Sequence, residues 1–270
     1  MNGKQEHSRR GVLRSAAGVT LGAGIAAGIS AAPATAAPAT AAPATAAGPG
    51  GGRKPRQVQV AVLLYDGFTA LDAVGPYEAL CRVPGVRVTT VAVKAGLVRT
   101  DTGELGLPAA KSLREVPRPD VLVIPGGGER GTTASMADAR ILDWIRRAHR
   151  HTTWTTSICT GSLILGAAGL LRGVPATTYW ASRPYLKEVG AIYTPGRFVE
   201  SGRIITAAGV SAGIDMGLHL AARLSDEEVG RAMELALEYD PEPPFGTGSP
   251  EKASPETTAL ALKLLADSAT

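Results

Sequence analysis

The sequence predicts an α/β fold, a three-layer sandwich in which a mostly parallel sheet lies between two layers of helices. Short apolar runs alternate with helical stretches from residue 58 onward, and the runs are continuously apolar, which is typical of strands buried on both faces. The chain has 270 residues, 44% of them hydrophobic, enough for one domain of ordinary size with additional segments. We expect the domain to span residues 58–250 and a tail helix to occupy 251–270.

Each expected strand is a short apolar run of β type. VQVAVLLY at 58–65 stops at Asp66-Gly67, and VLVIP at 121–125 stops at the glycines 126–128. The remaining expected strands are 86–93, 153–158, 176–178 and 203–207, and residues 97–107 are expected to form a hairpin.

The expected helices lie between these strands. In the stretch 72–82, Tyr77 and Leu80 belong to an apolar set at helical spacing, and the small-residue stretch 161–170 stops near Gly169. The other expected helices are 137–149, 212–224 and 227–239. Because the carboxyl ends of parallel strands form the working edge of such a sheet, we expect Asp72, the glycines 126–128 and Cys159 to gather there.

Charge and cysteine content exclude several classes of protein. The formal net charge is +4, but residues 1–46 account for +3, so the rest of the chain carries only +1. That leaves no basic surface for nucleic-acid phosphates. Two cysteines, Cys81 and Cys159, exclude a disulfide scaffold and a four-thiolate zinc site, and no metal is expected.

Residues 1–46 are expected to be an export signal rather than part of the fold. Arg9 and Arg10 precede a weakly hydrophobic stretch, so the segment resembles a twin-arginine signal. AAPAT follows three times over 31–45, and 47–57 is a glycine-rich linker. The most apolar run is only Gly/Ala-rich, so no membrane span is expected. We expect the protein to be secreted or exported to the cell-envelope side. The repeated small residues offer several possible cleavage sites for the signal, so the position of cleavage is not defined.

Cys159 is the best candidate for a nucleophile. The stretch SICTGS at 157–162 puts its thiol at a strand-to-helix turn, the geometry of a nucleophile elbow. The helix N-terminus is expected to stabilise the thiolate, and the N–H groups of Gly127 and Thr160 are the expected oxyanion-hole donors. The alternative is a buried structural cysteine. Cys81, on an apolar helix face, is expected to serve packing.

Asp72 is the expected proton-transfer partner, because no histidine is well placed. The four histidines lie in the signal, at the opposite edge of the sheet or inside a later helix: His7, His149, His151 and His219. Beside a thiolate the carboxyl of Asp72 is expected to have a raised pKa, and it could then donate and accept a proton. Its alternative role, capping a helix that starts at Ala73, stays open.

A second motif, GVSAG at 209–213, fits the nucleophile pattern of α/β hydrolases. Such an enzyme needs a histidine further along the chain, and the only one, His219, lies eight residues on in the same expected helix. We therefore interpret the motif as a glycine-permitted turn in which Ser211 caps the helix.

These stretches together resemble the ThiJ/PfpI superfamily, and within it the isonitrile hydratases. The similar stretches are LDAVGPYEAL (71–80), VLVIPGGG (121–128), TSICTGSLILGAAGLLRG (156–173), AGVSAGID (208–215) and LEYDPEPPFGTGSP (237–250). The resemblance implies a class I glutamine amidotransferase-like (flavodoxin-like) fold. It also implies that Cys159, Thr160 and Asp72 add water to a small-molecule isonitrile to give an N-substituted formamide, in a homodimer without metal or organic cofactor.

One departure affects the expected chemistry. Many relatives carry histidine in the motif A-T-T-H-W, whereas residues 176–180 read ATTYW. Tyr179 and Trp180 are expected to position the substrate, and the missing histidine favours hydration over peptidase or glyoxalase chemistry.

Two alternatives and several details stay open. One alternative is a non-catalytic small-molecule-binding domain, like the sensing half of some transcription regulators, although only twenty residues follow Pro250. The other is a cysteine-dependent stress enzyme acting on aldehydes or peptides. The native isonitrile, the pocket shape and the oxidation state of the cysteines after export are also open.

Overall fold

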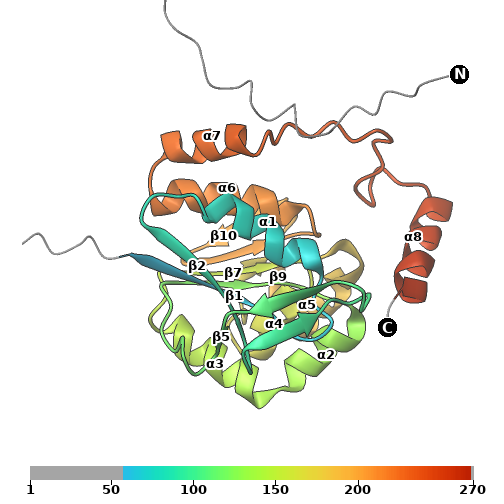
Figure 1. Cartoon of the computed structure of the whole chain (residues 1–270). Helices are drawn as coiled ribbons and strands as arrows, with labels where there is room; N and C mark the ends of the chain where they lie inside the picture. The colour runs from blue at the N-terminus through green and yellow to red at the C-terminus, as the bar shows by residue number, and fades with distance from the viewer. Residues whose placement is uncertain (1–56, 269–270) are drawn as a thin grey trace, which may run out of the picture. The chain divides into compact units, whose positions relative to one another are not determined.

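The structure, a computed structural model, describes residues 57–268. The expected signal at 1–46 and all but the last residue of the expected linker at 47–57 lie outside this range. The described residues contain a central, mostly parallel sheet with helices on both faces, which confirms the predicted α/β class (Figure 1).

The central sheet has seven strands in the order β10-β11-β7-β6-β1-β2-β5, and every neighbouring pair is parallel except β10 with β11. The strands of this sheet are β1 (Val58–Leu63), β2 (Val86–Ala92), β5 (Lys111–Ser112), β6 (Val121–Ile124), β7 (Trp154–Ile158), β10 (Phe198–Ser201) and β11 (Ile204–Ala207). Every residue of β6 and β7 is buried, which explains their unbroken apolar or small-residue sequence.

Two shorter pairings lie outside this sheet. β3 (Gly96–Arg99) pairs antiparallel with β4 (Gly106–Ala109), which confirms the predicted hairpin. β8 (Pro175–Ala176) pairs with β9 (Ile192–Tyr193). The sequence pattern had not indicated β5, β9 or β10, because two of them have only two residues and β10 carries the polar Glu200 and Ser201.

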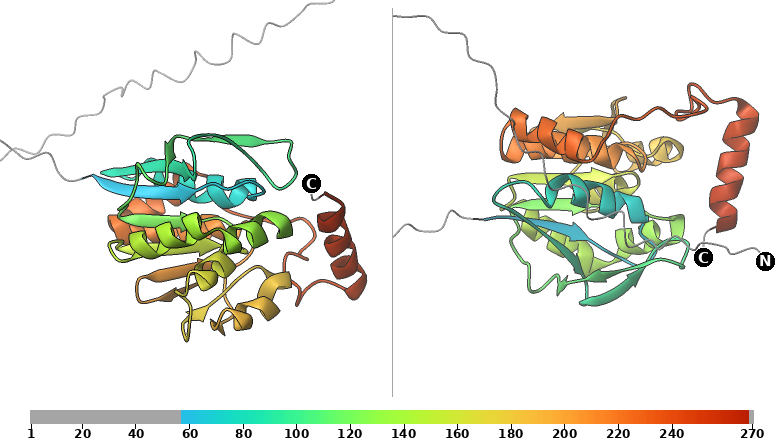
Figure 2. Two further views of the ribbon diagram at one scale, coloured as in Figure 1. Left: turned by 90° about the horizontal axis from the view of Figure 1, so that it is seen from below. Right: turned by 45° about the horizontal axis from the view of Figure 1, so that its top comes forward.

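The helices form two layers (Figures 1 and 2). One layer contains α1 (Ala70–Leu80), α6 (Ala212–Leu224) and α7 (Glu227–Ala236). The opposite layer contains α2 (Glu129–Ala137), α3 (Ala139–His149), α4 (Gly161–Ala167) and α5 (Arg183–Glu188), with the short 3₁₀ helix η2 (Trp180–Ser182) before α5. The last helix, α8 (Pro255–Ser268), buries none of its residues. Within residues 57–268, no helix combines the length and the apolar character that crossing a membrane requires.

The helix expected at 137–149 is correct only in part. Residues before it form a separate helix, α2, and Asp138 between the two caps α3 by accepting the N–H of Arg140. The sequence ERGTTASMA of α2 contains glycine and threonine, which are poor helix formers, and therefore gave no helical signal. Gly131 is nevertheless required there, because a Cβ atom would lie 2.7 Å from the carbonyl oxygen of Asp66.

The strand order sets the position of the functional edge. β6 lies between β1 and β7, and Ile124 at the end of β6 pairs with Ser157 near the end of β7. The segments that leave β1, β6 and β7 therefore emerge side by side. These segments carry Asp72, the glycines 126–128 and Cys159, as expected from the sequence.

Candidate active site

Cys159 lies at a sharp strand-to-helix turn between β7 and α4. Its φ of 56° falls in the left-handed region, which residues other than glycine rarely adopt. The Cys159 N–H donates to the carbonyls of Ala207 (3.1 Å) and Ala208 (2.7 Å). Its own carbonyl accepts the hydroxyls of Ser162 (3.1 Å) and Thr178 (3.0 Å). These bonds hold a strained residue in place, and strain of this kind is typical of functional sites.

The elbow also depends on a glycine two residues after the cysteine. A Cβ atom on Gly161 would lie 2.2 Å from the carbonyl oxygen of Ile124 and 2.7 Å from that of Pro125. Only glycine lets the start of α4 approach the end of β6 so closely.

Asp72 is completely buried in the first turn of α1. Its Oδ2 atom accepts the N–H of Gly126 at 2.9 Å, whereas Oδ1 is buried with no hydrogen bond of ordinary geometry. α1 begins at Ala70, and Thr69 occupies the N-cap position. The alternative that Asp72 caps a helix starting at Ala73 is therefore wrong.

Burial raises the pKa of Asp72 to about 7. The Gly126 N–H and the Cys159 thiol lower this pKa, and the negative charge of Asp101 raises it. The sequence predicted a raised pKa but attributed it to a neighbouring thiolate, whereas removal from water is the main cause. A carboxyl group with a pKa near 7 is well suited to take and return a proton at neutral pH.

Burial also raises the pKa of the Cys159 thiol well above its usual range, and the charge of Asp72 raises it further. The N–H groups of Thr160 and Val210 act in the opposite direction but do not outweigh burial. The N–H of Thr160 at the start of α4 thus favours the thiolate, as expected, but burial is the larger effect and leaves the pKa of the thiol raised. A thiol whose pKa is raised becomes nucleophilic only when a base takes its proton.

The Thr160 side chain is held by the loop that follows β6. Its hydroxyl oxygen accepts the N–H of Gly127 at 2.9 Å and lies 3.1 Å from the Gly127 carbonyl. It also lies 2.9 Å from the hydroxyl of Thr132 on α2. The Gly127 N–H was predicted to donate to the substrate as part of an oxyanion hole. Because this N–H already donates to the Thr160 hydroxyl, Gly127 can influence the substrate only through Thr160. The sequence reasoning missed Thr132, because α2 itself had not been predicted.

Gly126 separates Asp72 from Thr160. A Cβ atom at this position would lie 2.6 Å from the backbone nitrogen of Thr160 and 2.8 Å from Oδ2 of Asp72. The triple glycine after VLVIP therefore provides the space in which the carboxyl and the elbow approach each other.

Tyr179 lies close to both Cys159 and Trp180. Burial raises the pKa of Tyr179, and the proximity of Cys159 raises it further. The ring centroids of Tyr179 and Trp180 are 5.5 Å apart, with the rings tilted by 54°. Trp180 in turn lines a hollow of about 210 Å³ together with residues between Thr247 and Ala261. This geometry is compatible with the predicted positioning roles of both rings, which stay predictions.

The other candidate side chains lie elsewhere. Nδ1 of His149 lies 2.9 Å from the hydroxyl of Thr155 near the start of β7, at the opposite end of the strand from Cys159. Nε2 of His219 lies 2.6 Å from a carboxylate oxygen of Glu200. Cys81 is partly exposed at the C-cap of α1, so its expected packing role is only partly correct.

The GVSAG motif is not a second nucleophile elbow. Ser211 occupies the N-cap position of α6, as expected, but makes no capping hydrogen bond. Its hydroxyl instead accepts from the guanidinium of Arg197 at 3.3 Å. Gly209 does not have the positive φ expected of a glycine-permitted turn, and a Cβ atom there would lie 3.1 Å from the Tyr179 ring. Glycine at this position therefore makes room for Tyr179.

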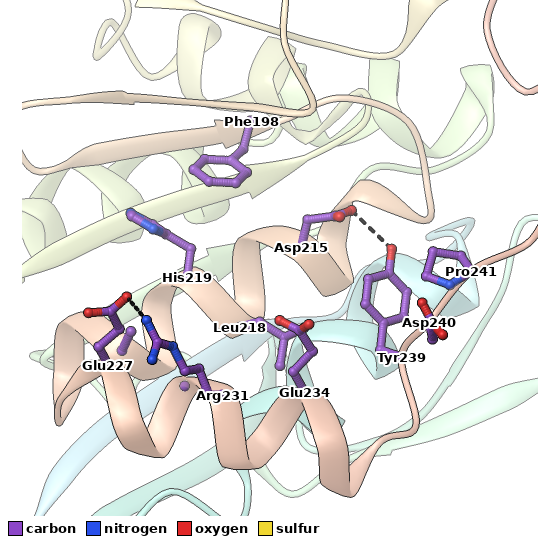
Figure 3. Close-up of a pocket in the computed structure, with 12 residues that line it drawn as sticks. Phe198, Asp215, Leu218, His219, Glu227, Arg231, Glu234, Tyr239, Asp240 and Pro241 are labelled. Carbon is purple, nitrogen blue, oxygen red and sulfur yellow. Dashed lines mark hydrogen bonds and ion pairs between the residues drawn. The ribbon is translucent and has the colours of Figure 1, made fainter.

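A larger hollow, of about 570 Å³, lies between α6 and α7 (Figure 3). Several of the polar groups that line it have partners: Glu227 binds Arg231 at 2.7 Å, and the hydroxyl of Tyr239 donates to Asp215 at 3.2 Å. Neither Asp72 nor Cys159 lines it. Within the range 57–268, no cluster of three or more His, Cys, Asp or Glu side chains has the arrangement of a metal site.

The fold and this site define an α/β protein with a cysteine on a nucleophile elbow and a buried carboxyl beside it. Residues 58–223 match the family described as DJ-1/PfpI, and the chain belongs to this family. It is 41% identical over 196 residues to a Pseudomonas putida protein named isonitrile hydratase, covering 73% of this chain and 85% of that one. A ThiJ/PfpI family protein from Pseudomonas syringae superimposes with a TM-score of 0.74 at 38% identity, over 78% of this chain and 87% of that one.

A transcriptional regulator from Pseudomonas aeruginosa, CdhR, belongs to a different functional class. It is 29% identical over 169 residues, which cover 60% of this chain but only 49% of the regulator. Similarity at this level extends to proteins of different activity, so it does not by itself establish a reaction.

Proposed function

We propose that this protein is an isonitrile hydratase that adds water to an isonitrile, R–NC, to give an N-substituted formamide. The observation that carries the proposal is the buried pair of Cys159 on its elbow and Asp72, whose pKa is about 7. The 41% identity to the Pseudomonas putida isonitrile hydratase supports the same reaction.

The first step forms a bond between Cys159 and the substrate. The Asp72 carboxylate takes the thiol proton as sulfur attacks the terminal isonitrile carbon. That carbon then carries negative charge and takes the same proton back from Asp72. The product is a thioimidate, R–N=CH–S, attached to Cys159, and the ionised Asp72 is regenerated.

The second step consumes water. Thr160 holds a water molecule next to the thioimidate carbon, Asp72 takes a proton from it, and the oxygen adds to that carbon. The substrate nitrogen is protonated by Asp72. The carbon–sulfur bond then breaks, the departing sulfur takes the hydroxyl proton by way of Asp72, and the N-substituted formamide leaves. No group other than water is consumed.

The test is to incubate purified protein with isonitriles of different size and to measure formamide by NMR. Saturable formamide production by the wild-type protein, and none by Cys159→Ala, is the expected result. If no isonitrile in the panel is hydrated while the Cys159 thiol is intact, the proposal is wrong.

A second candidate function is binding of a small molecule without catalysis. The similarity to the regulator CdhR favours it, because a domain that senses a small molecule needs a pocket that binds this molecule but does not need to catalyse a reaction. Saturable binding of an isonitrile or formamide without turnover, unchanged in Cys159→Ala, would identify this function.

We also propose, from the sequence, that the full chain is exported through its twin-arginine segment and that it forms a homodimer. Light scattering on the purified protein measures the oligomeric state directly, and a monomer at micromolar concentration would contradict the second of these proposals.

A further inference from the structure

The hydroxyl groups of Tyr65, Thr132 and Thr160 lie near the loop that follows β6. Two backbone carbonyls of this loop, those of Pro125 and Gly127, accept their hydrogen bonds. The hydroxyl of Tyr65 donates to the carbonyl of Pro125 at 3.1 Å and also interacts with Thr132. The hydroxyls of Thr132 and Thr160 each lie 3.1 Å from the same Gly127 carbonyl and 2.9 Å from each other. The two threonines thus share one acceptor, whose two lone pairs can take both protons, and a bond from one hydroxyl weakens the bond from the other.

Thr160 has a single hydroxyl proton, so it can donate a hydrogen bond to only one partner at a time. Its hydroxyl oxygen already accepts the Gly127 N–H at 2.9 Å, which fixes the position of the oxygen. The single hydroxyl proton is then donated to the Gly127 carbonyl, to Thr132 or to a molecule in the site. If the Gly127 carbonyl takes this proton, Thr160 has none to offer to substrate or water.

Burial distinguishes the two threonines. Thr132 is only 4% exposed, whereas Thr160 is partly exposed. Only Thr160 therefore has access to an incoming molecule, and the proton of Thr132 must be used inside the protein. The Gly127 carbonyl is an acceptor within reach of that proton.

We propose that Thr132 is a positioning residue for the hydration reaction: its hydroxyl binds the Gly127 carbonyl, which makes that carbonyl a weaker acceptor for Thr160 and leaves the Thr160 proton to the water that attacks the thioimidate. The inference rests on the proposed function and deepens it. Thr132 does not touch the substrate, and its effect passes entirely through Thr160. The step that it controls is the second one, hydrolysis, and not the attack by Cys159.

The test compares three variants on α2. Thr132→Val removes the hydroxyl at nearly constant shape, Thr132→Ser keeps it, and Thr133→Val makes the same helix change at the exposed neighbouring position. Each is measured for kcat and KM on a hydrated isonitrile, and by intact-protein mass spectrometry after rapid quenching. Melting temperatures establish that each variant is folded.

In Thr132→Val we expect kcat to fall by about 10- to 100-fold, as for loss of an aligned catalytic hydrogen bond. Protein carrying one added isonitrile mass should accumulate, because hydrolysis has become slow. Thr132→Ser should recover most of kcat without this accumulation, and Thr133→Val should match the wild type. In a Thr160→Val background, Thr132→Val should have no further effect on kcat.

Three results would overturn the inference. They are an unchanged kcat in folded Thr132→Val, a fall in kcat without accumulated adduct, and an equal loss in Thr132→Ser. If the wild-type protein hydrates no isonitrile, the proposed function fails, and this inference fails with it. If the wild type is active and Thr132→Val is equally active, only the role of Thr132 is refuted.

Discussion

The negative charge of Asp72 raises the pKa of Cys159, whereas the Cys159 thiol lowers the pKa of Asp72. The two groups therefore titrate as a pair, and the carboxyl, with a pKa of about 7, loses its proton well before the thiol does. Above pH 7 the Asp72 carboxyl is ionised and the one remaining proton of the pair is on the Cys159 sulfur, where the carboxylate can accept it. This is the state in which the proposed attack begins.

The first prediction concerns the pH dependence of turnover. We expect kcat/KM to rise as the pH increases through about 7 and then to level off, because the base form of Asp72 is required. Asp72→Asn should lower turnover by about a hundredfold or more and should lack this rise. Rates measured between pH 5 and 9 test this, and a wild-type rate that falls steadily from pH 6 to 8 would contradict it.

The second prediction concerns stability. The folded-state pKa of Asp72 lies above its model value of 3.8, so folding favours the protonated carboxyl. The stability it contributes is complete below about pH 4 and is lost as the pH rises through 7, by roughly 4 kcal/mol for a shift of about three units.

Asp72→Asn should remove this loss, so the variant should gain stability relative to wild type between pH 4.5 and 8. Urea denaturation at both pH values measures the difference, and Asp143→Asn, which removes an exposed carboxyl, is the control. A difference between Asp72→Asn and wild type that does not change with pH would show that Asp72 is ionised in both states.

The third prediction concerns the space between Asp72 and Thr160. Gly126→Ala places a Cβ atom within 2.8 Å of both residues, so we expect turnover to fall at least about a hundredfold, with a loss of stability of about 1–3 kcal/mol. Gly128→Ala is the matched control, because its Cβ would meet only the Asp101 side chain, at 3.2 Å. Equal activity of the two variants would show that the close approach is unimportant.

The fourth prediction concerns the backbone of the elbow. Thr178→Val removes a hydroxyl that donates to the Cys159 carbonyl, and it should cost about 1–3 kcal/mol because that buried carbonyl loses one of its two hydroxyl partners. We also expect slower alkylation of Cys159 by iodoacetamide, since the strained turn relaxes. Thr178→Ser should restore both properties, and a serine variant no better than valine would exclude the hydrogen bond as the cause.

The fifth prediction concerns export. Replacing Arg9 and Arg10 with lysine should leave the full chain in the cytoplasm, because the paired guanidinium groups are the feature that the twin-arginine pathway recognises. Cell fractionation measures this. Secretion of the lysine variant at the wild-type level would show that residues 1–46 have another role.

The alternation of strands and helices predicted the layers and the edge that carries Asp72 and Cys159, because a parallel sheet brings the ends of separated strands together. The hydrophobic pattern did not predict α2. The helix contains Gly131, which lowers helix propensity but is required because the backbone of Asp66 packs against it. Thr132 was missed for the same reason.

Sequence reasoning also misjudged the electrostatics of the site. Near Cys159 it considered the helix dipole, whereas the three-dimensional fold buries the thiol, and desolvation outweighs the nearby N–H groups. The capping interpretation of Asp72 failed because α1 starts at Ala70, and boundaries of helices are not sharply encoded. The burial of Cys159 and Asp72 depends on contacts between segments that are distant in the sequence, so it could not be predicted from the residues around each of them.

The most direct test of the proposed reaction is mass spectrometry of protein quenched during turnover, in Cys81→Ser so that Cys159 is the only thiol. We predict an added mass of one isonitrile on the peptide that contains Cys159, together with formamide whose oxygen comes from ¹⁸O-labelled water. Cys159→Ala should show neither adduct nor formamide. Formamide production by Cys159→Ala at the wild-type rate would contradict the central role of the cysteine.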